Sequence, residues 1–254
     1  MNKALIRIYS TYGLIIFAGA LILLYPLFIV AIWLPGGRSL GLLMNKLWAR
    51  MFLTLSLIPP QIKWKSTLEP DRQYIFVGNH TSYLDIVLMG YVPRLCVFVG
   101  KKSLSKVPIF GYMFRNLHIT VDRSNPRSRY QVFEEGSKVL DDGYSLVMFP
   151  EGGIRSTNPP NMASFRNGAF KLAITKNVSI VPVTMPHNWR IQPGDNRMIM
   201  HPEKPLAIFH KPIDTKLMQE SEADLLKNQV FNIIDSELRK YYPKLAEQPI
   251  SYEN

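Results

Sequence analysis

The chain lacks the cysteines that a disulfide framework needs, because Cys96 is the only one among its 254 residues. An internal disulfide is therefore excluded, which fits a domain that faces the cytoplasm. Cys96 lies in the apolar run LCVFV, where a lone cysteine usually packs as a small apolar side chain. We predict a packing role for it and not a nucleophilic one.

Acidic residues are absent from the first 68 positions, although the whole chain carries a net charge of +11. A basic surface attracts either nucleic acid or an anionic membrane leaflet. Here the basic residues stand on either side of a strongly apolar stretch, so the pattern favours a membrane over nucleic acid. The basic residues before Glu69 are Lys3, Arg7, Arg38, Lys46, Arg50, Lys63 and Lys65.

Charge of either sign is missing from residues 8–37. The apolar segment 12–34 is longer than the ~20 residues that a helix needs to cross a hydrocarbon core. A cleaved signal peptide is the competing interpretation, with a cleavage-like site at Ala20, but the apolar run continues well beyond that position. We reject cleavage and predict a membrane-embedded helix that is kinked at Pro26 and ends near Pro35.

A second apolar stretch, residues 40–58, carries Lys46 and Arg50 four positions apart and hence on one helical face. This pattern is typical of an amphipathic helix at a membrane interface. Basic residues flank the first segment on both sides, so a spanning helix and a hairpin in one leaflet both stay open. A helix buried in a soluble core is the third alternative. We assign residues 1–62 to membrane anchoring and residues 63–254 to a globular domain.

The globular part alternates short β-branched runs with helical patterns, which predicts an α/β fold with a mixed sheet flanked by helices. One predicted helix begins after Asn125 and ends before Gly143. The last helix has an apolar stripe and a capping box made by Ser221 and Asp224. The predicted strands are residues 74–78, 95–99, 118–121, 145–149 and 179–183, with two more in MIMH and LAIFH; the stripe consists of Leu225, Leu226, Phe231, Ile234 and Leu238.

The stretch NHTSYLD, residues 79–85, places His80 just after a predicted strand, where α/β sheets bind their ligands. On one straight helix, a spacing of five residues would separate His80 and Asp85 by about 140°. The two side chains can meet only if His80 lies in the turn and Asp85 in the first turns of the following helix. The carboxylate then accepts the imidazole Nδ1–H and leaves Nε2 available as a base.

Two further predicted strands end on charged residues. In VMFPEGGIRS, the glycines let backbone amides approach an anion, while Glu151 and Arg155 supply a carboxylate and a guanidinium that can grip phosphate. HITVDR ends on Asp122 and Arg123. Three strand ends of this kind indicate one shared site at an edge of the sheet.

With these blocks in this order, the chain resembles the glycerophospholipid acyltransferases, and among them the 1-acylglycerol-3-phosphate acyltransferases. NHTSYLD resembles the family block N-H-x-S-x-x-D, and ITVDR resembles the block that carries a phosphate-binding arginine. FPEGGIRS resembles F-P-E-G-T-R-S, with one extra residue before Arg155. Val181-Pro182-Val183 resembles the fourth block, and FRNGAFKLA also matches a family stretch. The resemblance covers roughly residues 74–183.

The resemblance implies an enzyme that moves a fatty acyl group from acyl-CoA or acyl-carrier protein to the free hydroxyl of 1-acylglycerol-3-phosphate, giving phosphatidic acid. It calls for no cofactor and no bound metal. An alcohol attacks a thioester only with the help of a positioned base. We predict that His80 is this base and that Asp85 orients it. The predicted substrate-binding residues are Asn79, Ser82, Arg123, Glu151, Gly152 and Arg155.

Two alternatives remain, acylation of another lysolipid and a non-enzymatic basic protein that binds a membrane or nucleic acid. The stretch KKSLSKVPIFGYMFR, residues 101–115, is basic enough for such binding, and its interleaved apolar residues suit a membrane interface better than nucleic acid. We expect the bilayer as the partner, and an inner or plasma membrane location with the active site facing the cytoplasm. His187 and Trp189 could line the site, but we expect them in a surface loop.

Overall fold

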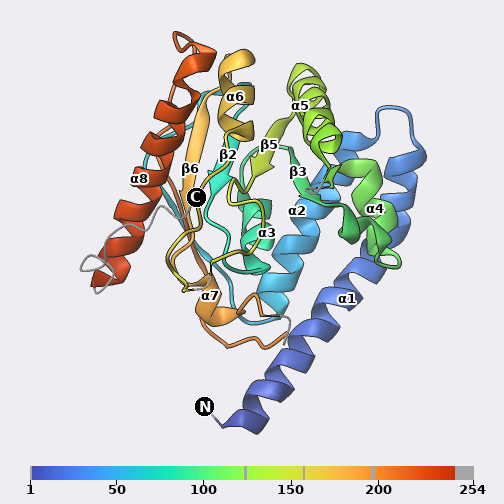
Figure 1. Ribbon diagram of the computed structural model, residues 1–254. Coiled ribbons are helices and arrows are strands. Elements are labelled where there is room, and N and C mark those ends of the chain that lie inside the picture. The colour runs from blue at the N-terminus through green and yellow to red at the C-terminus, as the bar shows by residue number, and fades with distance from the viewer. Residues whose placement is uncertain (1, 123–124, 157, 196–197, 244–254) are drawn as a thin grey trace.

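The computed structural model describes residues 2–122, 125–156, 158–195 and 198–243 (Figure 1). Within these residues, seven strands form one sheet in the order β1-β7-β6-β2-β5-β3-β4. The pairs are parallel except β6 with β7, so the predicted mixed sheet is confirmed. The strands are β1 (Gln61–Trp64), β2 (Ile75–Gly78), β3 (Cys96–Lys101), β4 (Ile119–Val121), β5 (Ser145–Met148), β6 (Ile180–Thr184) and β7 (Leu206–Phe209).

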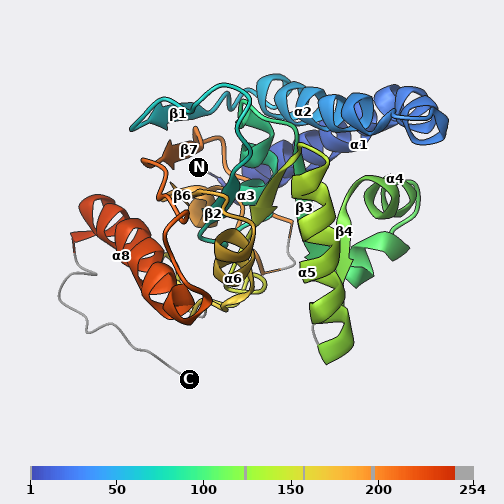
Figure 2. The same ribbon diagram turned by 90° about the horizontal axis from the view of Figure 1, so that it is seen from above.

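The central strands are buried on both faces, as a parallel sheet requires. In β2, Ile75 and Val77 join one apolar cluster, while Phe76 between them joins a second cluster on the other side. Figure 2 shows α5, α6 and α8 along one face and α1 and α2 along the other. The helices of the globular part are α3 (Leu84–Leu88), α4 (Phe110–Leu117), α5 (Pro126–Asp141), α6 (Gly168–Thr175), α7 (Asn188–Ile191) and α8 (Ala223–Tyr241), with short 3-10 turns η1 (Met89–Tyr91), η2 (Lys102–Lys106) and η3 (Glu220–Glu222).

The N-terminal region is a pair of packed helices, α1 (Lys3–Trp33) and α2 (Arg38–Leu55). Trp48 Nε1 in α2 donates to the carbonyl of Phe17 in α1 at 3.0 Å, and α1 continues through Pro26. In the described residues, α1 alone is long and apolar enough to cross a membrane, and only 28% of its most apolar window is buried. A core helix of a soluble domain would be mostly buried. α1 is thus a candidate membrane span.

The basic face predicted for α2 has contacts with the globular part, although the Arg50 side chain is also exposed. Lys46 Nζ donates to the carbonyl of Arg94 at 3.4 Å, and the Arg50 guanidinium lies 5.7 Å from the ring centroid of Tyr91. Both partners belong to the globular part. These two cations therefore attach α2 to the α/β domain, while the predicted contact of α2 with a membrane interface stays a prediction.

Several local predictions were wrong. β1 was not predicted; it spans the proposed boundary after residue 62, and the division into two domains stays a prediction. The segment MIMH forms no strand. The capping box is made by Gln219 and Glu222, not by Ser221 and Asp224. Leu225 is 60% exposed, because the buried stripe of α8 runs through Leu226, Val230, Ile234 and Leu238.

The helix predicted after Asn125 is α5, which Asn125 caps through a hydrogen bond from the Arg127 amide.

Candidate active site

The predicted site blocks follow strands that lie side by side in the sheet. β2, β5, β3 and β4 are neighbours and run parallel, so their carboxyl ends share one edge. NHTSYLD follows β2 and FPEGGIRS follows β5. β6 is also parallel to β2, which brings the segment after Thr184 to the same edge. Arg123, which was predicted to bind substrate, lies outside the described residues.

His80 and Asp85 meet at this edge. His80 precedes α3 and Asp85 lies in its first turn, and His80 Nδ1 stands 3.1 Å from Asp85 Oδ2. The backbone amides of Thr81 and Ser82 donate to the same oxygen at 2.7 and 2.8 Å, which curls the turn around the carboxylate. The imidazole stacks on Phe149, with 4.2 Å between ring centroids. Its Nε2 makes no hydrogen bond to any described residue.

The second oxygen of Asp85 is held by a residue that the sequence did not reveal. Asn188, at the start of α7, donates from Nδ2 to Asp85 Oδ1 at 2.8 Å, and both residues are completely buried. Oδ1 of Asp85 therefore accepts from the side-chain amide of Asn188. Its Oδ2 accepts from the two backbone amides and faces Nδ1 of His80. No local pattern in the sequence pointed to Asn188, because its contact spans 103 residues.

Asn79 and Ser82 use their polar groups within the protein. Asn79 Nδ2 donates to the carbonyl of Met185 at 3.1 Å, and the Met185 amide donates back to Asn79 Oδ1 at 2.8 Å. Ser82 Oγ donates to the carbonyl of Gln192 at 2.7 Å. Both side chains are completely buried. They tie the His80 turn to the segment after β6, while their predicted contact with substrate stays a prediction.

Glu151 bridges two loops from a fully buried position. Its Oε1 accepts from the His80 amide at 2.7 Å, and its Oε2 accepts from the Ala163 amide at 2.9 Å. Burial raises the pKa of the Glu151 carboxyl to about 8, although the hydrogen bonds from these two amides lower that pKa. Glu151 therefore fixes the backbone on which His80 is mounted.

The loop after Glu151 requires glycine and carries cationic groups. Gly152 has a φ of +77°, and a Cβ there would stand 2.9 Å from Nε of Arg166. Arg166 comes from the FRNGAFKLA stretch and was not singled out in the sequence. Arg155 is exposed, and its charge pulls down the pKa of Glu151. At the neighbouring strand ends, Lys101 of β3 lies across from Val121 of β4.

Among the described residues, no group of three or more His, Cys, Asp or Glu side chains is arranged to hold a metal ion. Cys96 is buried in β3, and burial raises the pKa of its thiol to about 12. A thiol with that pKa is almost entirely protonated at neutral pH and is a poor nucleophile.

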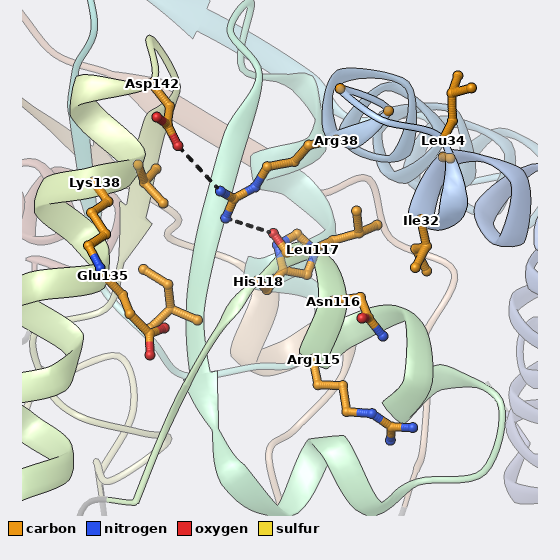
Figure 3. A pocket seen from close by; sticks show the side chains of 15 residues that line it. Ile32, Leu34, Arg38, Arg115, Asn116, Leu117, His118, Glu135, Lys138 and Asp142 are labelled. Carbon is orange, nitrogen blue, oxygen red and sulfur yellow. Dashed lines mark hydrogen bonds and ion pairs between the residues drawn. The ribbon is translucent and has the colours of Figure 1, made fainter.

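A cavity of about 470 Å³ lies elsewhere, between the turn that joins α1 to α2 and the C-terminal ends of α4 and α5 (Figure 3). Arg115 and Lys138 stand in the last turns of those two helices, and Arg38 donates to the carbonyl of Leu117 at 3.5 Å and lies 3.9 Å from Asp142. Helix C-termini carry partial negative charge, which these cations offset. The cavity opens by the amino end of β4, away from His80, and is not part of the candidate site.

A buried His–Asp pair with cations at neighbouring strand ends is an arrangement that can abstract a proton and bind an anion. Residues 60–186, half of the chain, match the acyltransferase family. The chain therefore belongs to the acyltransferase family.

Curated proteins that are similar to this chain are also named acyltransferases. The chain is 29% identical over 170 residues to a 1-acyl-sn-glycerol-3-phosphate acyltransferase of Chlamydomonas reinhardtii, covering 66% of this chain and 51% of that protein. It is 36% identical over 118 residues to that of Saccharomyces cerevisiae, covering 45% and 39%. For Haemophilus influenzae the values are 35% over 113 residues, covering 43% and 46%. The chain thus spans about half the length of the curated relatives it matches.

The fold also matches a solved structure. The crystal structure of the 1-acyl-sn-glycerophosphate (LPA) acyltransferase PlsC from Thermotoga maritima superposes with a TM-score of 0.77 at 20% identity. The match covers 95% of this chain and 98% of that one. It confirms the α/β fold together with its N-terminal helices.

Proposed function

We propose that this protein transfers a fatty acyl group from a thioester to the free hydroxyl of 1-acylglycerol-3-phosphate, giving phosphatidic acid. The observation that carries the proposal is the contact of His80 with Asp85 at the carboxyl edge of the sheet, at 3.1 Å. The names of the relatives support the choice of acceptor. The donor is acyl-CoA or acyl-carrier protein, and the reaction calls for no cofactor.

The chemistry follows from the orientation of the imidazole. Asp85 accepts the Nδ1–H and thereby leaves an unprotonated Nε2 to take the proton of the acceptor hydroxyl. The acceptor oxygen forms a C–O bond to the thioester carbonyl carbon, the C–S bond breaks, and the leaving sulfur takes the proton back from His80. No acyl-enzyme is required, because the thioester is already activated. Asn188 is a positioning residue in this scheme, since it touches Asp85 and not the substrate.

The acceptor phosphate is bound by cations at the same edge. Lys101 ends β3 beside β4, and Arg123 is placed there by the sequence alone. Arg155 and Arg166 lie on the loop side, around Gly152. A guanidinium binds phosphate with two parallel hydrogen bonds, which fixes its orientation. Asn79, Ser82 and Glu151 hold the backbone of the His80 turn through the contacts described above.

Residues 1–62 anchor the enzyme, with α1 in the membrane and the active site toward the cytoplasm, where acyl thioesters are made. The inner or plasma membrane is the expected location. Lifting the acyl tail of the acceptor into water costs about 0.8 kcal/mol per CH₂. An enzyme that stays at the interface avoids most of that cost.

A donor and acceptor panel tests the proposal. The purified full-length protein in lipid vesicles is given acyl-CoA or acyl-carrier protein together with 1-acylglycerol-3-phosphate or with lysolipids that carry other headgroups. Phosphatidic acid should be the main product. Preferential acylation of another lysolipid would reassign the acceptor, and no transfer to any acceptor would leave only the binding function.

A further inference from the structure

A surface beside the candidate site is basic and carries exposed apolar residues. Between Asp85 and Asp122 the chain has no acidic residue, and residues 101–115 hold four basic ones. Lys102, Lys106 and Arg115 are all exposed. Val107 and Ile109, which lie between them, are 45% and 48% exposed. We call the η2 turn, residues 107–109 and α4 the η2–α4 surface.

The backbone holds Ile109 outward in an unfavourable conformation. Ile109 has a φ of +63° and a ψ of −63°, and the Phe110 amide donates across it to the carbonyl of Pro108 at 2.7 Å. This is the rarer hand of the γ-turn, which is strained for any residue with a Cβ and more so for a β-branched one. Such strain persists where the outward side chain has a use.

The η2–α4 surface is continuous with the proposed membrane helix. Trp33, at the end of α1 and 75% exposed, donates from Nε1 to the hydroxyl of Tyr112 in α4 at 2.9 Å. Phe110 of α4 lies 6.0 Å from Trp48 of α2, ring centroid to ring centroid. Figure 1 shows α4 against α1. A bilayer in which α1 is embedded therefore lies next to the η2–α4 surface.

We propose that the η2–α4 surface is a second membrane contact, selective for anionic lipid. Val107 and Ile109 enter the interface, and Lys102, Lys106 and Arg115 lie among the headgroup phosphates. An acidic protein such as a donor carrier would suit the charges but would leave the exposed apolar residues and their continuity with α1 unexplained. This proposal rests on the proposed function, because that function places α1 in the membrane. Since η2 directly follows β3, the contact would hold the catalytic edge of the sheet against the bilayer.

The depth of the η2–α4 surface in the bilayer is the decisive readout, because α1 alone can keep altered proteins on membranes. Cys96 is buried and its thiol has a raised pKa, so a cysteine introduced at the surface can be labelled selectively. Ile109→Cys and, as a second variant, Val107→Cys receive an environment-sensitive fluorophore in the full-length protein. Leu217→Cys is the control, because Leu217 is 97% exposed and lies far from η2 in the sequence. Vesicles contain phosphatidylglycerol, with bromine on the acyl chains as quencher.

The labels at positions 109 and 107 should shift to the blue and be quenched, and the label at 217 should not. On anionic vesicles, Lys102→Gln with Lys106→Gln should move the label at position 109 toward the water-exposed state, by about five-fold per charge in the equilibrium of this surface contact, and should leave the signal on neutral vesicles unchanged. Lys216→Gln is the charge control. Water-like emission at both positions in vesicle-bound protein would overturn the proposal, as would a shift produced only by carrier protein. Transfer to detergent-dispersed acceptor, measured in parallel, separates this failure from failure of the proposed function.

Discussion

Asn188 holds the Asp85 oxygen that faces away from His80, through a hydrogen bond of 2.8 Å between two completely buried side chains. The two oxygens of Asp85 thus have different partners, and the carboxylate cannot rotate without breaking contacts on both. The orientation of the imidazole therefore depends on a residue of α7, which is remote in the sequence.

Asn188→Ala should lower kcat by up to about 100-fold with little change in acceptor KM, because a displacement of about 1 Å in a catalytic group has effects of that size. A double-mutant cycle separates positioning from general damage. In an Asp85→Asn background the same substitution should have almost no further effect. Losses that multiply in the double variant would show that Asn188 acts independently of Asp85.

Glu151 makes stability depend on pH with a defined sign. Burial raises its pKa from 4.5 to about 8, so between these values the folded chain holds a proton that the unfolded chain has released. The contribution of Glu151 to the free energy of unfolding must then fall as pH rises from about 4.5 to about 8, and stay level above that.

Thermal unfolding in detergent micelles from pH 5 to 9 checks this. The stability of the wild-type protein relative to Glu151→Gln should decrease across the range up to about pH 8. Glu220→Gln, at an exposed position, is the matched control and should show no such trend. A relative stability that stays level from pH 5 to 9 would mean that Glu151 is ionised in the folded protein throughout this range.

Cys96 should be dispensable for the chemistry. Because its thiol is buried and has a pKa raised to about 12, iodoacetamide should leave turnover of the folded enzyme unchanged. Cys96→Ala should keep turnover close to that of the wild type. Rapid inactivation by the reagent, absent in Cys96→Ala, would point to a thiol in the mechanism.

The outward face of α1 should control membrane attachment. Leu23, in α1, is 68% exposed. A lysine at the centre of a membrane helix disfavours insertion by about 2.5–3.5 kcal/mol, so Leu23→Lys should move protein from the membrane fraction to the soluble one after a salt wash. Leu225→Lys makes the same change at a 60% exposed position on α8 and should not. Equal behaviour of both variants would place the anchor elsewhere.

Local patterns were enough to predict the alternating elements, the start of a helix after Asn125 and the meeting of His80 with Asp85. The five-residue spacing needs a turn followed by a helix, and the sequence supplies both. In contrast, β1 was missed because QIKW is largely exposed at a sheet edge and lacks a buried-strand pattern. That the basic pair on α2 also contacts the globular part was not predicted, because composition cannot show which surfaces a helical face meets.

Long-range contacts account for the missed parts of the site. Asn188 reaches Asp85 across 103 residues and Asn79 reaches Met185 across 106, and neither pair has a local signature. Arg166 is set against Gly152 by a hydrogen bond from its backbone amide to the carbonyl of Pro150, again a tertiary contact. The motifs located the edge of the sheet, while the side chains that hold those motifs in place emerge only from the fold.

The turnover of His80→Ala on vesicles that contain 1-acylglycerol-3-phosphate and acyl-CoA tests the central claim most directly. Fluorescence or sedimentation with the same vesicles confirms that the variant is folded and bound. If His80 is the base that Asp85 orients, phosphatidic acid formation should fall by about 10²–10⁴-fold while vesicle binding is unchanged. Turnover near that of the wild-type enzyme in a folded, membrane-bound variant would contradict the account.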